Sequence, residues 1–263
     1  MNTIDFDIDG KGVGRLRIAR PDVHNAFNDQ VIKEMSAALE QASERKDLRL
    51  LIITGAGKSF SAGADLGWMR SMADASQEDN RADSAQLAKL MRTLNFFPRP
   101  TVARVNGSAF GGGVGLIACC DVAIAAKSAR FGLTEVRLGL IPAVISPYVI
   151  DAIGARSARR LFLTGEHFSA ERAVELGLVS EACDSEDLDD RVAECTRHLL
   201  RAGPRATGEA KDLIATVSGR TLEEQMRLDE DTAMRIARLR VSAEGQLGLK
   251  AFLDKSTPDW SSV

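Results

Sequence analysis

Residues 105–115 have the sequence VNGSAFGGGVG, and they follow a short apolar strand predicted over Val102–Val105. A glycine cluster at the end of a strand lets a ligand approach the backbone closely, and a helix that begins at residues 111–113 directs its N-terminal amides at that ligand. A second run of small residues, SFSAGADL at residues 59–66, follows a strand ending at Thr54. Together the two loops predict two backbone N–H groups around one oxygen, an oxyanion hole. From composition alone, two turns selected for tight packing are an equal alternative.

The elements predicted around these loops alternate between strand and helix. An alternating run over residues 4–19 with glycines at 10–14 predicts a hairpin, and Asn28 precedes a helical period over 28–45. The apolar run 48–54 predicts a strand covered on both faces. Further elements are a polar loop and then a helix within 70–97, strands at 122–126, around Phe131 and at 179–182, and helices near 146–153, 156–163 and 169–176. The order predicts an α/β fold.

Beyond about residue 185 the pattern is helical only, over 186–201, 205–217, 221–240 and 242–254. We therefore predict a core domain over residues 1–190 and a helical C-terminal region over residues 191–263. Apolar stripes of the C-terminal helices indicate subunit contacts, because a small appendage cannot bury them alone. The stripes consist of Leu222, Met226, Leu228, Met234, Ile236 and Leu239.

The composition excludes several classes of function. The 263 residues include 34 Lys and Arg against 37 Asp and Glu, and only 5% aromatic residues, which argues against a nucleic-acid partner. The four cysteines form no CxxC pair and the three histidines have no ligand spacing, so we expect neither a metal site nor a redox centre. The run from Met1 to Asp7 has no signal-peptide character, and the run Val114–Cys120 is too short to cross a bilayer. A cytoplasmic protein without membrane contact is expected.

Two glycine patterns do not fit the motifs that they suggest. Gly57-Lys58-Ser59 resembles the end of a phosphate-binding loop, but Ile52 occupies the position of its first glycine. The glycines at 111–115 do not match the dinucleotide-binding pattern either, since residue 116 is Leu. The chain is predicted to hydrolyse no nucleotide and to bind no dinucleotide.

Five motifs occur in an order that resembles the crotonase (enoyl-CoA hydratase/isomerase) superfamily. They are FSAGADL at 60–66, VNGSAFGGG at 105–113, FGLTEVRLGLIP at 131–142, LTG at 163–165, and the pattern Ala170-x-x-Ala173-x-x-x-Gly177-Leu178-Val179. The resemblance extends from about residue 10 to residue 254. It implies a crotonase-like spiral of repeated ββα units with a helical C-terminal region, assembled as a homotrimer or homohexamer. It also implies an acyl-CoA thioester as substrate, with no separate cofactor.

The resemblance also assigns residues to the binding of the thioester. The two oxyanion-hole N–H groups fall on Ala64 and Gly112, on either side of the thioester oxygen. The stretch around Ala62, with Gly63, Asp65 and Leu66, would line the coenzyme A site. Candidates for its phosphates are His24, Lys250 and Lys255, with ordinary surface side chains as the alternative.

The acid–base residues depart from the usual pattern. Hydratases of this superfamily carry two glutamates, of which the second falls on Glu135 and the first on position 115, where this chain has Gly115, which would border the substrate. Partial burial should raise the pKa of Glu135 toward a range useful for proton transfer. Two reactions remain open. Glu135 alone activates water and yields a 3-hydroxyacyl-CoA, or it moves a proton between two carbons as in a Δ3/Δ2-enoyl-CoA isomerase.

The surrounding sequence favours hydration. Residues 112–121 and 134–148 are similar to bacterial methylglutaconyl-CoA and isohexenylglutaconyl-CoA hydratases, which implies a branched 2-enoyl-CoA from leucine or terpene degradation. Arg137, two residues beyond Glu135 on a segment expected to be extended, would meet the extra carboxylate of such a substrate or form a structural ion pair. Trp68, Met69 and Met72 are candidates for the acyl pocket or the core. A non-catalytic RNA-binding or scaffold role is a third alternative, which the acidic charge balance disfavours.

Overall fold

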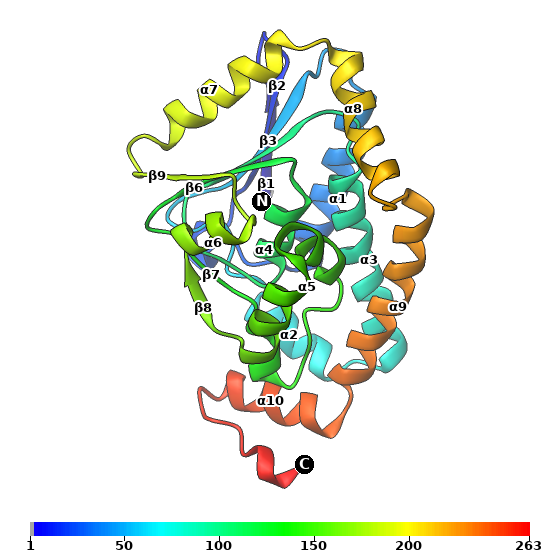
Figure 1. Cartoon of the computed structure of the whole chain (residues 1–263). Coiled ribbons are helices and arrows are strands. Elements are labelled where there is room, and N and C mark those ends of the chain that lie inside the picture. The colour runs from blue at the N-terminus through cyan, green and yellow to red at the C-terminus, as the bar shows by residue number, and fades with distance from the viewer. Residues whose placement is uncertain (1–2) are drawn as a thin grey trace.

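The strands of the computed structural model, which describes residues 3–263, form two sheets (Figure 1). The larger sheet has six strands in the order β1-β2-β3-β4-β6-β9, and the smaller has the order β5-β7-β8. The first sheet contains β1 (Ile4–Ile8), β2 (Val13–Ile18), β3 (Leu50–Gly55), β4 (Thr101–Val105), β6 (Val122–Ala126) and β9 (Glu181–Cys183), and the second contains β5 (Ala109–Phe110), β7 (Arg130–Gly132) and β8 (His167–Ser169). The predicted α/β class is confirmed. Met1 and Asn2 lie outside the described residues. They begin both the predicted core domain and the run from Met1 to Asp7, on which the prediction of a cytoplasmic location partly depends.

Strands β1 and β2 form the predicted hairpin, and β2, β3, β4, β6 and β9 pair in parallel. The packing of strand β3 explains why residues 50–53 are all apolar. Leu51 and Ile53 belong to a cluster with α1 (Asp29–Glu44) and α3 (Gln77–Asn95), whereas Leu50 and Ile52 pack in a second cluster with α7 (Leu188–Arg201). Figure 1 shows α7 on the opposite side of the sheet from α1 and α3. The prediction of a strand covered on both faces is confirmed.

The segment before α3 differs from its prediction. Helix α2 (Leu66–Ala73) occupies the start of the region expected to be a polar loop. Asp65 caps this helix by accepting hydrogen bonds from the amides of Gly67 (2.8 Å) and Trp68 (3.2 Å). This capping makes a short helix stable where its composition suggests a loop.

Other elements follow their predictions closely. Helix α1 begins after Asn28, whose side chain accepts a hydrogen bond from the amide of Val31 at 3.0 Å. Helices predicted near 146–153 and 156–163 join in α5 (Ser146–Thr164), which is interrupted at Gly154 with a φ of 73°. The remaining helices are α4 (Gly112–Cys119), α6 (Ala170–Leu176), α8 (Pro204–Val217), α9 (Leu222–Arg240), α10 (Ala243–Leu253), and the 3-10 helices η1 (Pro21–Val23), η2 (Glu135–Leu138) and η3 (Trp260–Ser262).

The C-terminal helices pack onto the rest of the chain. Helix α9 runs along α3 (Figure 1), where a buried ion pair joins Arg92 to Asp229. Of the predicted apolar stripe, Ile236 is buried in the core, whereas Leu222, Met226 and Met234 are about half exposed. Part of the stripe therefore packs within the chain. The exposed part remains available for the predicted contacts between subunits.

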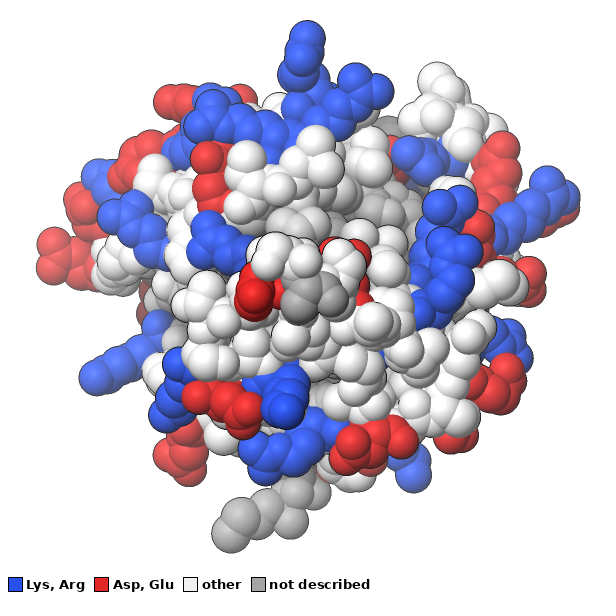
Figure 2. Space-filling model, turned by 90° about the horizontal axis from the view of Figure 1, so that it is seen from below, with Lys and Arg blue, Asp and Glu red and all other residues white. Residues whose placement is uncertain are grey.

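The charges on the face at the α10 end are mixed. Figure 2 shows Lys and Arg interspersed with Asp and Glu around its rim, and mainly other residues at its centre. No strong field of one sign is expected on this face. Within residues 3–263, none of the helices combines the length and apolar character required to span a bilayer.

Candidate active site

A cavity of about 400 Å³ lies where the two loops of small residues meet η2 and the C-terminal helices. Residues 62–64 form one part of its wall and residues 110–112 another. Most of the remaining lining comes from α2, α3, η2 and the loop that follows it, the end of α9, and α10. Segments far apart in the sequence thus enclose one space, as expected for a ligand site.

Backbone hydrogen bonds hold the two loops against each other. The amide of Phe110 donates to Ser61 O at 2.9 Å, and Ser61 forms a parallel bridge with Ala109. Gly63 has a φ of 86°, and a Cβ added there would lie 2.9 Å from Phe110 O. Only glycine permits both this conformation and this close contact. The small residues therefore serve to bring two strand ends together.

The amides of Ala64 and Gly112 are both free to bind a ligand. Ala64 lies in a parallel bridge with Phe27, in which Phe27 N donates to Gly63 O and Asp65 N donates to Phe27 O, each at 2.7 Å. The N–H of Ala64 itself therefore points away from this partner. Gly112 is the first residue of α4, where amides have no acceptor within the helix. Neither amide has an acceptor among the described residues, and both residues line the cavity.

Glu135 is the only residue with a carboxylate among the described residues that line the cavity. It begins η2, and its Oε2 is buried without a hydrogen-bond partner. A Cβ added at Gly111 would lie 3.1 Å from Glu135 Oε1, so the carboxylate lies beside the start of α4. Burial raises the pKa of Glu135 to about 7. A group with this pKa can both accept and return a proton near neutral pH.

Gly115 faces an isoleucine rather than the cavity. A Cβ added at Gly115 would lie 2.3 Å from Ile145 Cγ2 and 2.9 Å from Ile145 Cβ. Ile145 lines the cavity, whereas Gly115 is buried behind it and is not one of the lining residues. Gly115 therefore does not border the cavity, contrary to the prediction. The side chain of Ile145 fills the space that a larger residue at position 115 would require.

The residues predicted for coenzyme A lie in different places. Ala62 and Gly63 line the cavity, and the amide of Ala62 donates to His24 O at 2.9 Å, so His24 lies close to this end. Leu66, Lys250 and Lys255 are exposed and are not lining residues. The predicted set is thus only partly brought together.

Asp65 has a structural environment. Besides capping α2, its Oδ2 lies 2.9 Å from Arg20 Nη2. Burial opposes ionisation, but the hydrogen bonds from Trp68, Arg20 and Gly67 prevail and lower the pKa of Asp65. The carboxylate fixes the segment that carries Ala64, and Asp65 does not line the cavity.

The expectation that Arg137 shares a face with Glu135 on an extended segment is wrong. Residues 135–138 form a 3-10 helix, in which residues two apart point in different directions. Arg137 lines the cavity but is exposed.

Several residues that line the cavity were not predicted from the sequence, among them Ser84, Ile145 and Arg240. Arg240 is 160 positions from Asn80, to which it donates a hydrogen bond, and no local motif marks either residue. Trp68, Met69 and Met72, by contrast, line the cavity as one of their two predicted roles.

Sequence and structure comparisons agree on the family. Residues 9–263 match the family model described as enoyl-CoA hydratase/isomerase. A putative enoyl-CoA hydratase of Thermus thermophilus is 31% identical over 90% of this chain and 93% of its own, and 1,2-epoxyphenylacetyl-CoA isomerase of Escherichia coli is 33% identical over 95% of each. The crystal structure of an enoyl-CoA hydratase from Shewanella pealeana matches with a TM-score of 0.80 and 44% identity, covering 98% of this chain and 96% of the other. The chain therefore belongs to the enoyl-CoA hydratase/isomerase family.

Proposed function

We propose that this protein adds water to the 2,3 double bond of a branched enoyl-CoA thioester. The observation that carries the proposal is the meeting of two unpartnered amides, from Ala64 and Gly112, and one buried carboxylate, from Glu135, at a single cavity. If both amides donate to the thioester oxygen, they stabilise an oxyanion, and each is worth a few kcal/mol, roughly, in a transition state.

The chemistry needs one acid–base group. The Glu135 carboxylate removes a proton from water, and the water oxygen bonds to the β-carbon of the thioester. The electron pair of the double bond moves toward the carbonyl, where the two amides hold the enolate oxygen. The protonated Glu135 then returns its proton to the α-carbon, which restores the carboxylate and gives a 3-hydroxyacyl-CoA. A pKa of about 7 suits both halves of this cycle.

The coenzyme A portion is assigned to the end of the site near Ala62. The backbone of residues 62–63 would lie along it, with His24 as the nearest of the predicted phosphate contacts. Roles for Lys250 and Lys255 remain predictions, as do a homotrimer or homohexamer and a cytoplasmic location.

An isomerase is the second candidate, and the packing at Gly115 favours it. Ile145 fills the space beside Gly115, so the described cavity wall offers no second carboxylate to position water. One carboxylate is enough to move a proton between two carbons. Hydration is preferred because residues 112–121 and 134–148 resemble branched glutaconyl-CoA hydratases, which share the glycine at this position.

An assay with three thioesters tests the choice of reaction. The purified protein is offered 3-methylglutaconyl-CoA, crotonyl-CoA and a 3-enoyl-CoA, and absorbance of the conjugated thioester is followed. Loss of absorbance with 3-methylglutaconyl-CoA is expected, with slower loss for crotonyl-CoA. Gain of absorbance with the 3-enoyl-CoA alone would contradict the proposal and identify the isomerase.

A further inference from the structure

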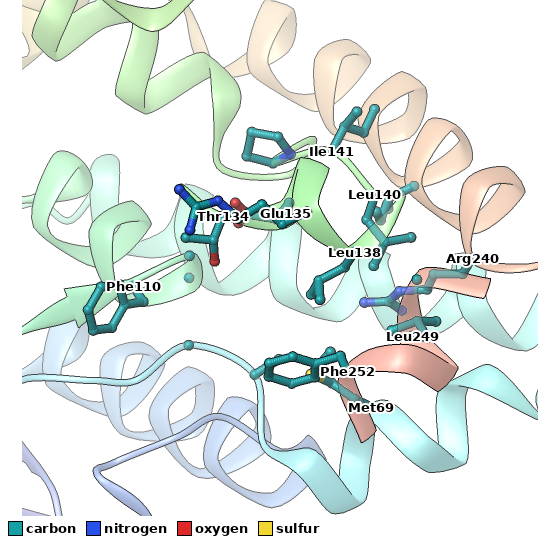
Figure 3. Close-up of a pocket in the computed structure, with 18 of the residues that line it drawn as sticks. Met69, Phe110, Thr134, Glu135, Leu138, Leu140, Ile141, Arg240, Leu249 and Phe252 are labelled. Atoms are coloured by element: carbon teal, nitrogen blue, oxygen red, sulfur yellow. The ribbon is translucent and has the colours of Figure 1, made fainter. Parts of the chain in front are cut away.

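Of the two arginines among the described residues that line the cavity, Arg240 is the less exposed. It ends α9, and only 14% of its side chain is exposed. Figure 3 shows its guanidinium directed toward the other labelled side chains, with Glu135 in a separate part of the view and Leu138 between them. Leu138, Leu140, Leu249 and Phe252 supply apolar lining around the two polar groups.

Three neighbours hold the guanidinium in place. Arg240 Nη1 donates to Asp83 Oδ2 at 3.0 Å and to Asn80 Oδ1 at 3.2 Å. The guanidinium carbon lies 5.7 Å from the centre of the Trp68 ring, and the indole N–H of Trp68 donates to Asp83 Oδ1 at 3.0 Å. A charge fixed in this way loses little further entropy when it binds a ligand.

The other edge of the guanidinium remains available. Among the described residues, Nε and Nη2 of Arg240 have no acceptor, whereas Nη1 has two. This pair of nitrogens has the geometry that binds both oxygens of a carboxylate side by side. Asp83 balances the charge of Arg240 but leaves this edge unoccupied.

A second, independent polar group points to a ligand in the same cavity. Ser84 is 1% exposed, lines the cavity, and has a buried hydroxyl without a partner. It follows Asp83 on α3, so it lies next in sequence to the residue that positions Arg240. A buried hydroxyl without a partner costs about 1–3 kcal/mol, and a ligand oxygen would remove this cost.

We propose that Arg240 and Ser84 form a carboxylate subsite, so that the preferred thioester carries an acidic group on its acyl chain away from the thioester carbonyl. This inference rests on the proposed function and extends it from a reaction to a substrate class. It replaces Arg137, which is exposed to solvent, as the partner of the extra carboxylate.

Binding of saturated thioesters tests the subsite without any reaction. Calorimetry compares 3-methylglutaryl-CoA with isovaleryl-CoA, which has the same branch but no carboxylate. The wild-type protein is expected to bind the former about 10- to 100-fold more tightly, the range of a charge-assisted hydrogen bond. Arg240→Met should reduce the ratio to near one, and Ser84→Ala should reduce it several-fold.

Two further variants secure the interpretation. Arg240→Met combined with Asp83→Asn removes both charges and avoids a buried carboxylate without its partner. Arg238→Met, an exposed residue of the same helix, should retain the full ratio. Equal affinity of the wild-type protein for both thioesters would overturn the subsite, as would a preference lost in Arg137→Met but retained in Arg240→Met. A preference without turnover of any enoyl-CoA would instead overturn the proposed reaction and leave the subsite intact.

Discussion

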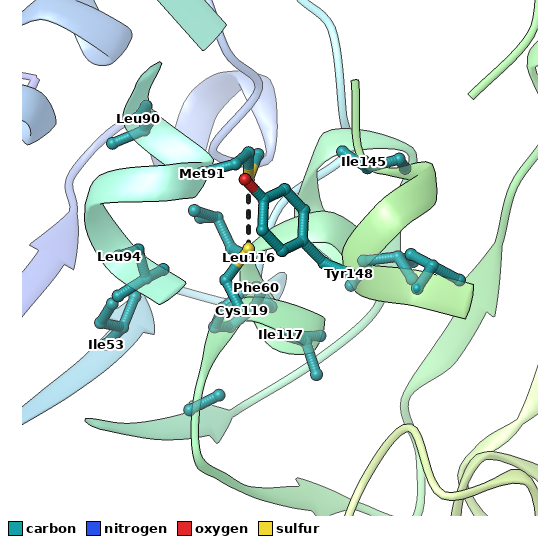
Figure 4. Close-up of a cluster of buried hydrophobic side chains, with 14 of the residues drawn as sticks. Ile53, Phe60, Leu90, Met91, Leu94, Leu116, Ile117, Cys119, Ile145 and Tyr148 are labelled. Atoms are coloured by element: carbon teal, nitrogen blue, oxygen red, sulfur yellow. Dashed lines mark hydrogen bonds between the residues drawn. The ribbon is translucent and has the colours of Figure 1, made fainter. Parts of the chain in front are cut away.

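Ile145 separates two regions that each contain a buried oxygen without a partner. On the cavity side, Oε2 of Glu135 lacks a hydrogen bond, and on the core side the hydroxyl of Tyr148 lacks one. Figure 4 shows Tyr148 among buried apolar side chains, next to Met91 and Cys119, whose sulfur atoms lie 3.9 Å apart. Tyr148 is 2% exposed and is not one of the residues that line the cavity.

Burial has the same electrostatic direction in both regions but different consequences. It raises the pKa of the Tyr148 hydroxyl above its usual value, and it raises the pKa of Glu135 to about 7. The carboxylate borders a space large enough for a ligand, whereas the hydroxyl is enclosed by packed side chains. A buried polar atom without a hydrogen-bond partner therefore indicates a functional role only where it borders a cavity that a ligand can enter.

The largest expected effect is that of Glu135→Gln. The amide retains the size of the carboxylate but cannot accept the proton, so kcat should fall about a hundred- to ten-thousandfold. Hydration of the enoyl-CoA measures the effect, and calorimetric binding of a saturated thioester provides the control, which should change little. Retained turnover would mean that the Glu135 carboxylate, like the Tyr148 hydroxyl, is not needed for the reaction.

Gly115→Ala should disturb both regions at once. The new methyl group would overlap with Ile145, and overpacking of this kind costs about 1–3 kcal/mol of unfolding free energy. Urea unfolding of Gly115→Ala, Ile145→Ala and the double variant measures the coupling, which should be at least about 0.5 kcal/mol in favour of the double variant. Additive effects would mean that the two residues do not share this space.

The pH dependence should follow the carboxylate. Since Glu135 must be ionised to accept a proton, kcat/KM should fall about tenfold per unit below pH 7 and level off above it. The raised pKa also means that the folded protein retains a proton that the unfolded chain has released between about pH 4.5 and 7. The contribution of Glu135 to unfolding free energy therefore falls as pH rises through this window. Denaturant titrations of the wild type and Glu135→Gln check this difference, which is expected to close below pH 4.5.

The smallest effect is expected for Tyr148→Phe. Removing a hydroxyl without a partner should leave unfolding free energy unchanged or raise it by up to about 1 kcal/mol. Steady-state kinetics should match the wild type. A large loss of activity would instead show that the Tyr148 hydroxyl contributes to the chemistry although it does not line the cavity.

Patterns within a few residues predicted most of the fold. The hairpin, the capped helix α1, the buried strand β3 and the four C-terminal helices follow from periodicity and capping, which act locally. Strands β5 and β8 are two and three residues long, and α2 depends on a single capping aspartate, so their local signals are weak.

The site was predictable only where its parts lie in motifs. Ala64, Gly112 and Glu135 lie in short runs of small or ordered residues, and the structure brings all three to one cavity. Arg240 and Asp83 come together because α9 packs along α3, a contact between residues more than 150 positions apart, and Ser84 follows Asp83 in sequence. Ile145 acquires its role from the absence of a side chain at Gly115, which no pattern around residue 145 reveals.

The last long helix forms part of the cavity wall that faces η2. Gly248 of α10 approaches so closely that an added Cβ would lie 2.3 Å from Leu138 O, and Leu249 and Phe252 line the cavity. A chain without residues 243–253 would therefore leave the carboxylate and both amides in a cavity open to water on this side.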